Sequence, residues 1–167
     1  MKSSPSWQRS VGALALFVMI TLAAATVGAW ASQASPQIYA ALTKPVWAPP
    51  AWLFGPVWSL LYLSMALAAW LVWRSGPTAE SKRAIRLYSI HLIFQALWSW
   101  LFFGIGRADA AMLDIVVLWL MIAAMIHAFH RCHRLASTLL IPYLLWVSFA
   151  AALNAALWGL NGGALPR

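Results

Sequence analysis

The chain has 167 residues, of which 63% are hydrophobic and only 8% are charged, and its mean hydropathy is +0.78. Soluble domains carry about 25% charged residues, so this composition excludes an ordinary soluble domain and indicates an integral membrane protein. The net charge of +8 does not point to nucleic acid, because the basic residues lie between apolar runs rather than along one face. Anionic lipid headgroups are the partner expected for them, and no nucleic acid is expected.

Five apolar runs are long enough to cross a bilayer as helices, which predicts an all-α bundle in a single transmembrane domain, residues 1–167. The first run also resembles a signal peptide, because Lys2 and Arg9 precede it and Ala29-Trp30-Ala31 ends it. Signal-peptide apolar regions have only about 7–15 residues, so a retained helix is favoured. The five crossings are expected at about residues 11–31, 56–73, 87–105, 110–129 and 136–158.

Residues 33–55, which we call the lid loop, are predicted to be ordered. Pro45, Pro49 and Pro50 each remove a backbone donor, so a continuous helix or a central strand is excluded there. Trp47 and Trp52 add more aromatic surface than a linker carries, and this surface must be buried against the helices. On the first crossing, the small residues Thr21, Ala25, Gly28 and Ser32 share one face, which suits close helix packing.

The basic residues predict the orientation of the bundle. Five crossings place the N-terminus and the second and fourth loops on one side, which then holds eight of the eleven Lys and Arg residues. The other side holds Lys44, Arg107 and Arg167. By the positive-inside rule, the N-terminus is expected in the cytoplasm and the lid loop outside it.

Aromatic and polar residues recur on the helix faces beneath the lid loop. One face of the third crossing carries His91, Gln95, Trp98 and Phe102, and one face of the fifth carries Trp146, Ala150, Asn154 and Trp158. The second crossing has a matching stripe of Trp58, Tyr62 and Met65, and Asp114 lies about one turn inside the fourth. Aromatic walls with a few polar groups indicate a site for a flat apolar ligand. The alternatives are helix packing for the tryptophans, interhelical hydrogen bonds for Gln95 and Asn154, and an Arg107 ion pair or helix cap for Asp114.

A second cluster has the spacing of metal ligands, with His127, His130 and His133 beside Cys132. Two neighbouring arginines would oppose a cation, so an interfacial anchor is favoured and no metal site is assigned. The chain shows no nucleophile–base pair, glycine-rich phosphate loop or paired carboxylates, which argues against conventional hydrolytic or transfer chemistry.

Three ordered motifs resemble those of the tryptophan-rich sensory protein / translocator protein family, also called the peripheral benzodiazepine receptor family. The first is Lys44-Pro45-x-Trp47-x-Pro49-Pro50-x-Trp52-x-Phe54-x-Pro56-Val57-Trp58-x-x-x-Tyr62. The others are Trp98-Ser99-x-x-Phe102-Phe103-Gly104 and Pro142-Tyr143-Leu144-Leu145-Trp146-Val147-Ser148-Phe149-Ala150-x-x-Leu153-Asn154. Together they cover nearly the whole chain.

The resemblance implies a five-helix bundle, usually a homodimer, that binds porphyrins such as protoporphyrin IX and haem, sterols, and isoquinoline or benzodiazepine-type drugs. Bacterial members resemble regulators of tetrapyrrole and stress responses, and some members degrade porphyrin in light. By position, the family's pocket residues fall on Tyr39, Pro49, Trp58, Trp98, Trp146, Ala150 and Leu153. His91 departs from the family's pattern and could contact a porphyrin propionate or metal. The animal sterol-recognition pattern after the fifth helix is absent, so cholesterol transport is not expected.

The expected function is therefore that of a receptor-like tetrapyrrole-binding protein in a bacterial cell membrane, with porphyrin or haem as ligand and no required cofactor. The alternatives are a light-dependent porphyrin-degrading enzyme and a transporter of porphyrin or sterol. The expected ligand-binding residues are Tyr39, Pro49, Trp58, His91, Gln95, Trp98, Asp114, Trp146, Ala150, Leu153 and Asn154.

Overall fold

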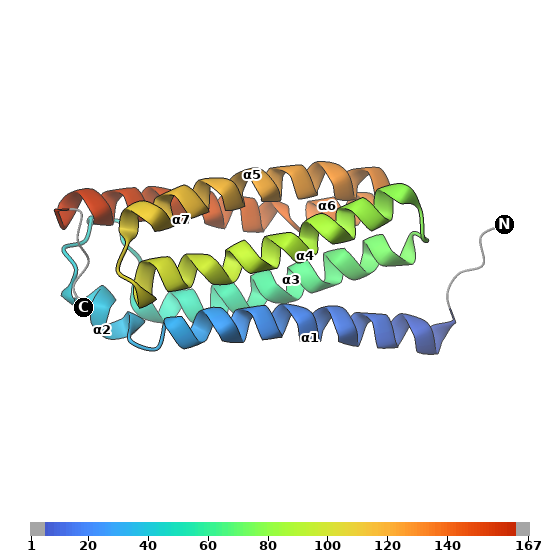
Figure 1. Ribbon diagram of the computed structural model, residues 1–167, viewed down its shortest axis with the longest axis horizontal. Coiled ribbons are helices and arrows are strands. Elements are labelled where there is room, and N and C mark those ends of the chain that lie inside the picture. Colours follow the sequence, from blue (N-terminus) through green and yellow to red (C-terminus); the bar gives the residue numbers. More distant parts are fainter. Residues whose placement is uncertain (1–5, 163–167) are drawn as a thin grey trace.

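The computed structural model describes residues 6–162; Lys2 and Arg167, which entered the expectations above, lie outside this range. Between residues 6 and 162 the regular structure is helical, without a strand. The long helices run lengthwise along the molecule (Figure 1). In chain order the elements are α1 (Trp7–Ala31), α2 (Ser35–Ala41), the 3-10 turn Ala51–Leu53, α3 (Phe54–Arg74), α4 (Ala79–Ser99), the π-helical turn Trp100–Gly104, α5 (Ala108–Cys132), α6 (Arg134–Thr138) and α7 (Ile141–Leu160).

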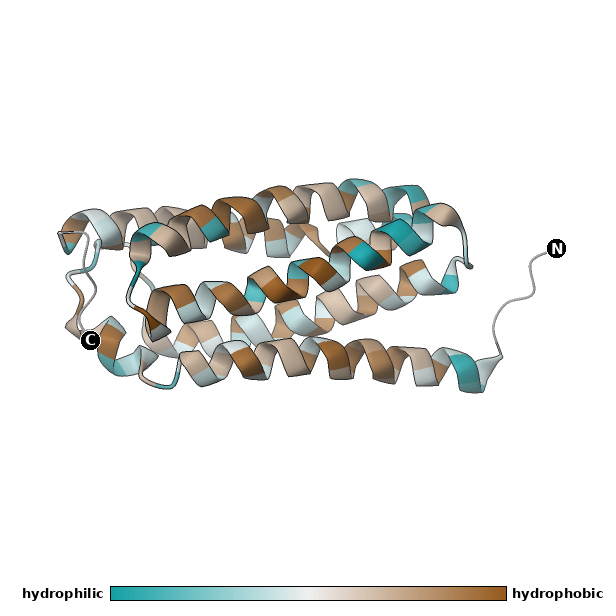
Figure 2. Cartoon of the chain, viewed as in Figure 1, coloured by the Kyte–Doolittle hydropathy of each residue, from teal (hydrophilic) through white to brown (hydrophobic). Residues whose placement is uncertain are grey.

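Five of the helical segments are long and apolar enough to cross a membrane. Apolar residues cover their middle portions, and hydrophilic residues gather toward the ends (Figure 2). Large apolar side chains such as Leu113 and Leu120 stay exposed on the outside of the bundle, where lipid rather than water would surround them. The predicted five-helix fold is confirmed, and the chain is an integral, multi-pass membrane protein.

The bundle is held together by close helix pairs. α1 packs against α3 and α4, α4 packs against α5, and α5 packs against α7. Between them lies a core whose largest fully buried side chains include Tyr88, Tyr143, Phe129 and Met65. Alanines at positions 66, 68 and 69 on α3 are also buried, and such small residues let helix backbones approach closely in a membrane.

The small-residue face of α1 does pack against another helix, as its spacing predicted. A Cβ placed on Gly28 would lie 3.3 Å from Oγ of Ser99, so α1 and α4 meet at this glycine. About two turns earlier, the hydroxyl groups of Thr21 and Tyr88 are hydrogen-bonded across the same pair of helices. Ala25 and Ser32, which lie on the same face, border the cavity described below.

Two helix boundaries differ from the prediction for identifiable reasons. Most of the connector expected at residues 74–86 is the first part of α4, because Thr78 caps this helix. The Thr78 hydroxyl accepts from the Ser81 amide at 3.1 Å, and the Ser81 hydroxyl accepts from the Thr78 amide at 3.0 Å. The fifth crossing is divided into α6 and α7, with Pro142 in the first turn of α7. Proline lacks the N–H that would continue the earlier helix.

The lid loop is ordered and contains α2 and the 3-10 turn, at the end of the bundle opposite the start of α1 (Figure 1). The Tyr39 hydroxyl donates to the Pro49 carbonyl at 2.8 Å, and the Lys44 ammonium donates to the Tyr39 and Leu42 carbonyls at 2.8 and 3.0 Å. Asn161, just after α7, bonds both the amide and the carbonyl of Thr43, at 2.9 and 3.0 Å. These bonds hold the segment across the helix ends.

Candidate functional site: a cavity beneath the lid loop

A cavity of about 300 Å³ lies inside the bundle at the end that the lid loop covers. Its wall draws on α1, α2, α3, α4, α5 and α7 and on the π-helical turn. This volume is at the lower end of the roughly 300–1,000 Å³ that small-molecule sites occupy. The cavity is thus large enough for one ligand and is reached by residues from every membrane-crossing segment.

Three tryptophans form the aromatic wall, one each from α3, α4 and α7: Trp58, Trp98 and Trp146. The Trp98 ring stacks on Phe102, with centroids 5.1 Å apart and planes 17° from parallel. Phe54, at the start of α3, meets Trp146 edge-on at 5.9 Å. These contacts fix the ring planes, so the wall presents flat apolar surfaces of defined direction.

The lid loop joins this aromatic wall through Tyr39. Its ring meets Phe54 edge-on at 5.5 Å, and its side chain borders the cavity. Burial raises the pKa of the Tyr39 hydroxyl above its usual value, and this hydroxyl donates to the Pro49 carbonyl. Pro49 itself does not line the cavity; its carbonyl holds the tyrosine that does.

The structure brings eight of the eleven expected site residues to the cavity wall: Tyr39, Trp58, Gln95, Trp98, Trp146, Ala150, Leu153 and Asn154. Pro49, His91 and Asp114 lie outside it. The i+4 spacing on α7 and the shared face on α4 therefore identified neighbours in space correctly. The three exceptions each have a separate explanation in the surrounding contacts.

His91 is fully buried one turn deeper than Gln95, behind the wall. Its Nε2 lies 2.9 Å from the Tyr143 hydroxyl. That hydroxyl donates in turn to Oε1 of Gln95, and Nε2 of Gln95 donates to the Tyr62 hydroxyl at 3.3 Å. The residue expected to touch a ligand is thus the inner end of a row of four polar side chains.

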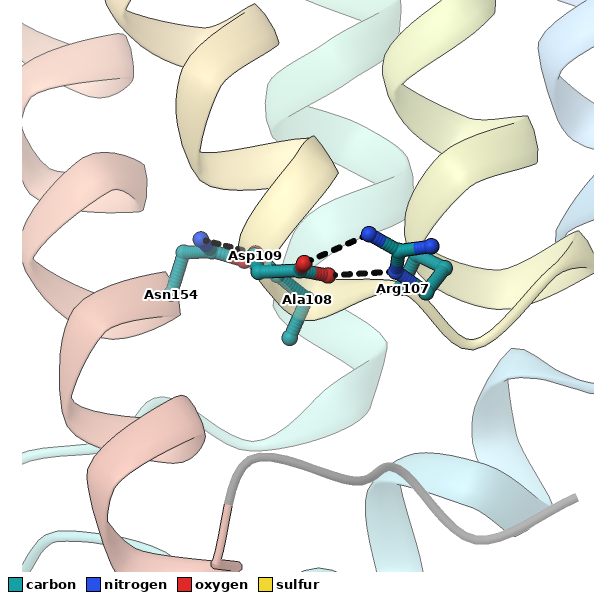
Figure 3. A network of polar contacts seen from close by, with 4 residues as sticks. All are labelled: Arg107, Ala108, Asp109 and Asn154. Carbon is teal, nitrogen blue, oxygen red and sulfur yellow. Dashed lines mark hydrogen bonds and ion pairs between the residues drawn. The ribbon is translucent and has the colours of Figure 1, made fainter.

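Asp114 is buried on α5, and its Oδ2 has no hydrogen-bond partner in the part of the chain that the structure describes. The proposed ion pair with Arg107 is wrong, because Arg107 forms two 2.7 Å bonds to Asp109 (Figure 3). Asp114 is not a helix cap either, since the residue before the first turn of α5 is Arg107.

Asn154 does join two helices, as one of its alternatives predicted. Its side-chain nitrogen donates from α7 to the Ala108 carbonyl of α5 at 3.3 Å (Figure 3) and lies at the same distance from the Met112 sulfur. Asn154 also borders the cavity, so interhelical bonding and wall formation occur in the same side chain.

Sequence reasoning did not include several wall residues in the site. Tyr62 follows Trp58 by one helical turn and was placed on the same predicted stripe, but it was not among the expected ligand-binding residues. Ala25 and Ala29 of α1, and Ser32 just after it, border the cavity because small residues leave room beside them. Phe103 reaches the wall from the π-helical turn, a deviation that is frequent at functional sites and has no simple sequence signal.

The histidine cluster at the end of α5 does not assemble a metal site among residues 6–162, where no group of three or more His, Cys, Asp or Glu residues could hold an ion. Nδ1 of His130 instead lies 3.3 Å from the Ser137 hydroxyl of α6. This contact links the two sides of the turn between α5 and α6.

Comparison with known proteins identifies related chains over almost the full length. A model of the TspO/MBR family matches residues 16–159. The chain is 37% identical to "Protein CrtK" of Rhodobacter capsulatus, over 92% of this chain and 97% of that protein. It is 39% identical to "Tryptophan-rich protein TspO" of Chlorobaculum tepidum, over 89% and 95%. It is also 37% identical to human "Translocator protein", over 75% of each chain.

Proposed function

The chain belongs to the TspO/MBR family of membrane proteins, and we propose that it binds tetrapyrroles such as protoporphyrin IX or haem in the cavity beneath the lid loop. The observation that carries the proposal is the wall of three tryptophans from three different helices. A macrocycle is a flat apolar ligand, and indole rings bind such faces by stacking and by burying apolar area.

The polar groups around the cavity suit a ligand that carries hydrogen-bond acceptors at its edge. The indole N–H groups of Trp98 and Trp146 have no partner within residues 6–162, and tryptophan nitrogen can only donate. Gln95 and Asn154 add amide groups to the same wall. A porphyrin has carboxylates at its rim and a hydrophobic face, which is the combination that these residues can accommodate.

A tetrapyrrole would fill the whole cavity and displace part of its cover. Tyr39 and Phe54 are the aromatic side chains that connect the cover to the wall. We therefore propose that ligand binding moves the lid loop outward while the three wall tryptophans stay on their helices.

The physiological role that fits this binding is regulatory, in a tetrapyrrole or stress response, with the protein as a homodimer in a bacterial cell membrane.

The stacking role is tested by Trp98→Ala, with Trp7→Ala as the matched control because Trp7 is 82% exposed and lies outside the cavity. Purified proteins are titrated with protoporphyrin IX, and binding is followed by the porphyrin's own absorbance. We expect Trp98→Ala to weaken binding by about three- to tenfold, from the loss of aromatic contacts and buried area. Equal affinities in all three proteins would remove the stacking role.

Light-dependent porphyrin degradation is the second candidate, because Trp58 and Trp146 border the same cavity and could react with a photoexcited ligand. Complexes are kept in the dark or illuminated, and the integrated porphyrin absorbance is followed. Pure binding leaves the integrated absorbance unchanged in the light and in the dark. Degradation lowers it in the light, and the loss should be larger with the wild-type protein than with the double variant Trp58→Phe/Trp146→Phe, which is the control. A transporter would instead move porphyrin across liposome membranes.

A further inference from the structure

Four polar side chains from three helices form one continuous hydrogen-bonded row: Tyr62 on α3, Gln95 and His91 on α4, and Tyr143 on α7. Tyr62 and Gln95 line the cavity, whereas His91 and Tyr143 are fully buried. The row therefore has an outer end at the cavity wall and an inner end in the core. The position of the hydrogen on His91, at the inner end, therefore determines whether the Tyr62 hydroxyl, at the outer end, can donate to a ligand.

In the first of two possible hydrogen arrangements, all donors point outward. His91 donates from Nε2 to the Tyr143 oxygen, Tyr143 donates to Oε1 of Gln95, and Nε2 of Gln95 donates to the Tyr62 oxygen. Each hydroxyl has one hydrogen, and that of Tyr62 remains unused by the row. Nδ1 of His91 is left as an acceptor without a partner in the described structure.

The second arrangement turns the Gln95 amide over, so that its oxygen faces Tyr62 and its nitrogen faces Tyr143, the opposite of the placement in the structure, and it reverses every bond. Tyr62 donates to the Gln95 amide oxygen, the amide nitrogen donates to Tyr143, and Tyr143 donates to Nε2 of His91. A neutral imidazole carries one N–H, which must then sit on Nδ1, the buried atom that has no partner. Orphaned buried N–H groups are rarer in proteins than unsatisfied acceptors, so the first arrangement is the stable one.

We infer that the row fixes the Tyr62 hydroxyl as a hydrogen-bond donor toward the cavity, so that the site selects ligands with an acceptor oxygen, such as a carboxylate or carbonyl, at that position. The inference rests on the proposed function and deepens it, because it names the ligand group that α3 recognises. Tyr62 contacts the ligand, while Gln95, Tyr143 and His91 are positioning residues that set the direction of its donor.

The ligand preference is tested with Tyr62→Phe, which removes one hydroxyl and keeps the ring. Tyr88→Phe is the matched control, because Tyr88 lies outside the cavity and its hydroxyl bonds Thr21. Both variants and the wild type are titrated with protoporphyrin IX, which has two carboxylates, and with octaethylporphyrin, which has only alkyl substituents. Thermal unfolding in the same detergent verifies that the variants are folded.

We expect Tyr62→Phe to lower the affinity for protoporphyrin IX by about tenfold, as for a hydrogen bond to a charged acceptor, and to change octaethylporphyrin binding less than twofold. Tyr88→Phe should change neither. An equal effect on both ligands, or no effect, overturns the donor role of Tyr62 while leaving porphyrin binding intact. If the wild type binds neither porphyrin, the proposed function and this inference both fail.

The direction of the row is tested independently on the wild-type protein. Nitrogen-15 NMR of histidine-labelled protein distinguishes protonated from unprotonated ring nitrogens, and the His91→Asn variant identifies which signals belong to His91. We expect Nε2 to be protonated and Nδ1 to be unprotonated. Protonation on Nδ1 alone would reverse the row and overturn the inference, whatever the binding titrations give.

Discussion

At the scale of single residues, the buried polar groups of this bundle differ in whether they have partners. Gln95 uses both ends of its amide, accepting from Tyr143 and donating to Tyr62. Asp114 is also buried, yet one of its carboxyl oxygens has no partner within residues 6–162. Burying a polar group costs free energy unless hydrogen bonds replace those lost to water, so removing the two side chains should have opposite effects.

We predict that Asp114→Leu leaves the free energy of unfolding unchanged or raises it, because a buried carboxyl whose Oδ2 has no partner within residues 6–162 is replaced by an apolar side chain of similar size. Gln95→Leu should lower it by about 1–3 kcal/mol, because the buried Tyr143 hydroxyl loses the acceptor that Gln95 supplies. Thermal unfolding of the purified variants in one detergent compares them. A marked loss of stability in Asp114→Leu would show that this carboxyl has a partner that stabilises the fold.

Sequence spacing predicted the aromatic wall well, because Trp58, Trp98 and Trp146 lie on regular helices where residues one turn apart share a face. It did not predict the position of His91, since the partner that holds it, Tyr143, comes from another helix 52 residues away. Periodicity indicates which face a residue occupies. It does not indicate how deep a cavity reaches along that face.

At the scale of elements, the helices were predicted and their interruptions were not. Leu139 and Leu140 favour a helix, so the break before α7 follows from Pro142 rather than from the residues at the break. The π-helical turn at Trp100–Gly104 lies in an apolar run with no comparable signal. It depends on packing, including the 3.2 Å bond from the Trp100 indole nitrogen to the Val27 carbonyl of α1.

The contact between α1 and α4 gives a test at this scale. Gly28→Leu should destabilise the fold, because even a Cβ at this position would lie 3.3 Å from Oγ of Ser99 and 3.7 Å from the Ala96 backbone. Overpacking of this kind costs about 1–3 kcal/mol. Gly12→Leu is the matched control, since it lies on the same helix and a Cβ there meets nothing within 4 Å.

Thermal unfolding in detergent should therefore separate the two leucine variants, with a lower midpoint only for Gly28→Leu. Gly12→Leu should keep or raise the midpoint, because leucine has a better helix propensity than glycine. Equal midpoints would mean that α1 can move away from α4 without cost. The small-residue face of α1 would then not be a packing surface.

At the scale of the whole molecule, the two ends of the bundle differ. One end has the lid loop, which α2 marks in Figure 1, and the cavity lies beneath this loop. The opposite end has basic residues close to the α3–α4 and α5–α6 turns, including Arg83 in the first part of α4 and Arg131 in the last turn of α5. The motifs and the family match agree on the fold, and the orientation of the bundle in its membrane is predicted from the distribution of basic residues.

The positive-inside rule predicts that the basic end faces the cytoplasm and the lid loop faces the opposite side. Because Cys132 is the single cysteine, cysteine labelling allows a direct test. Cys132 is first replaced by serine. A new cysteine is then introduced either at Val46 in the lid loop or at Ala79 at the start of α4, and both of these positions are exposed. A membrane-impermeant maleimide added to intact bacterial cells with a permeabilised outer membrane should label Val46→Cys and spare Ala79→Cys. Labelling of both after the inner membrane is opened is the control for reactivity. The reverse pattern would place the cavity at the cytoplasmic face, so that a tetrapyrrole would reach it from inside the cell.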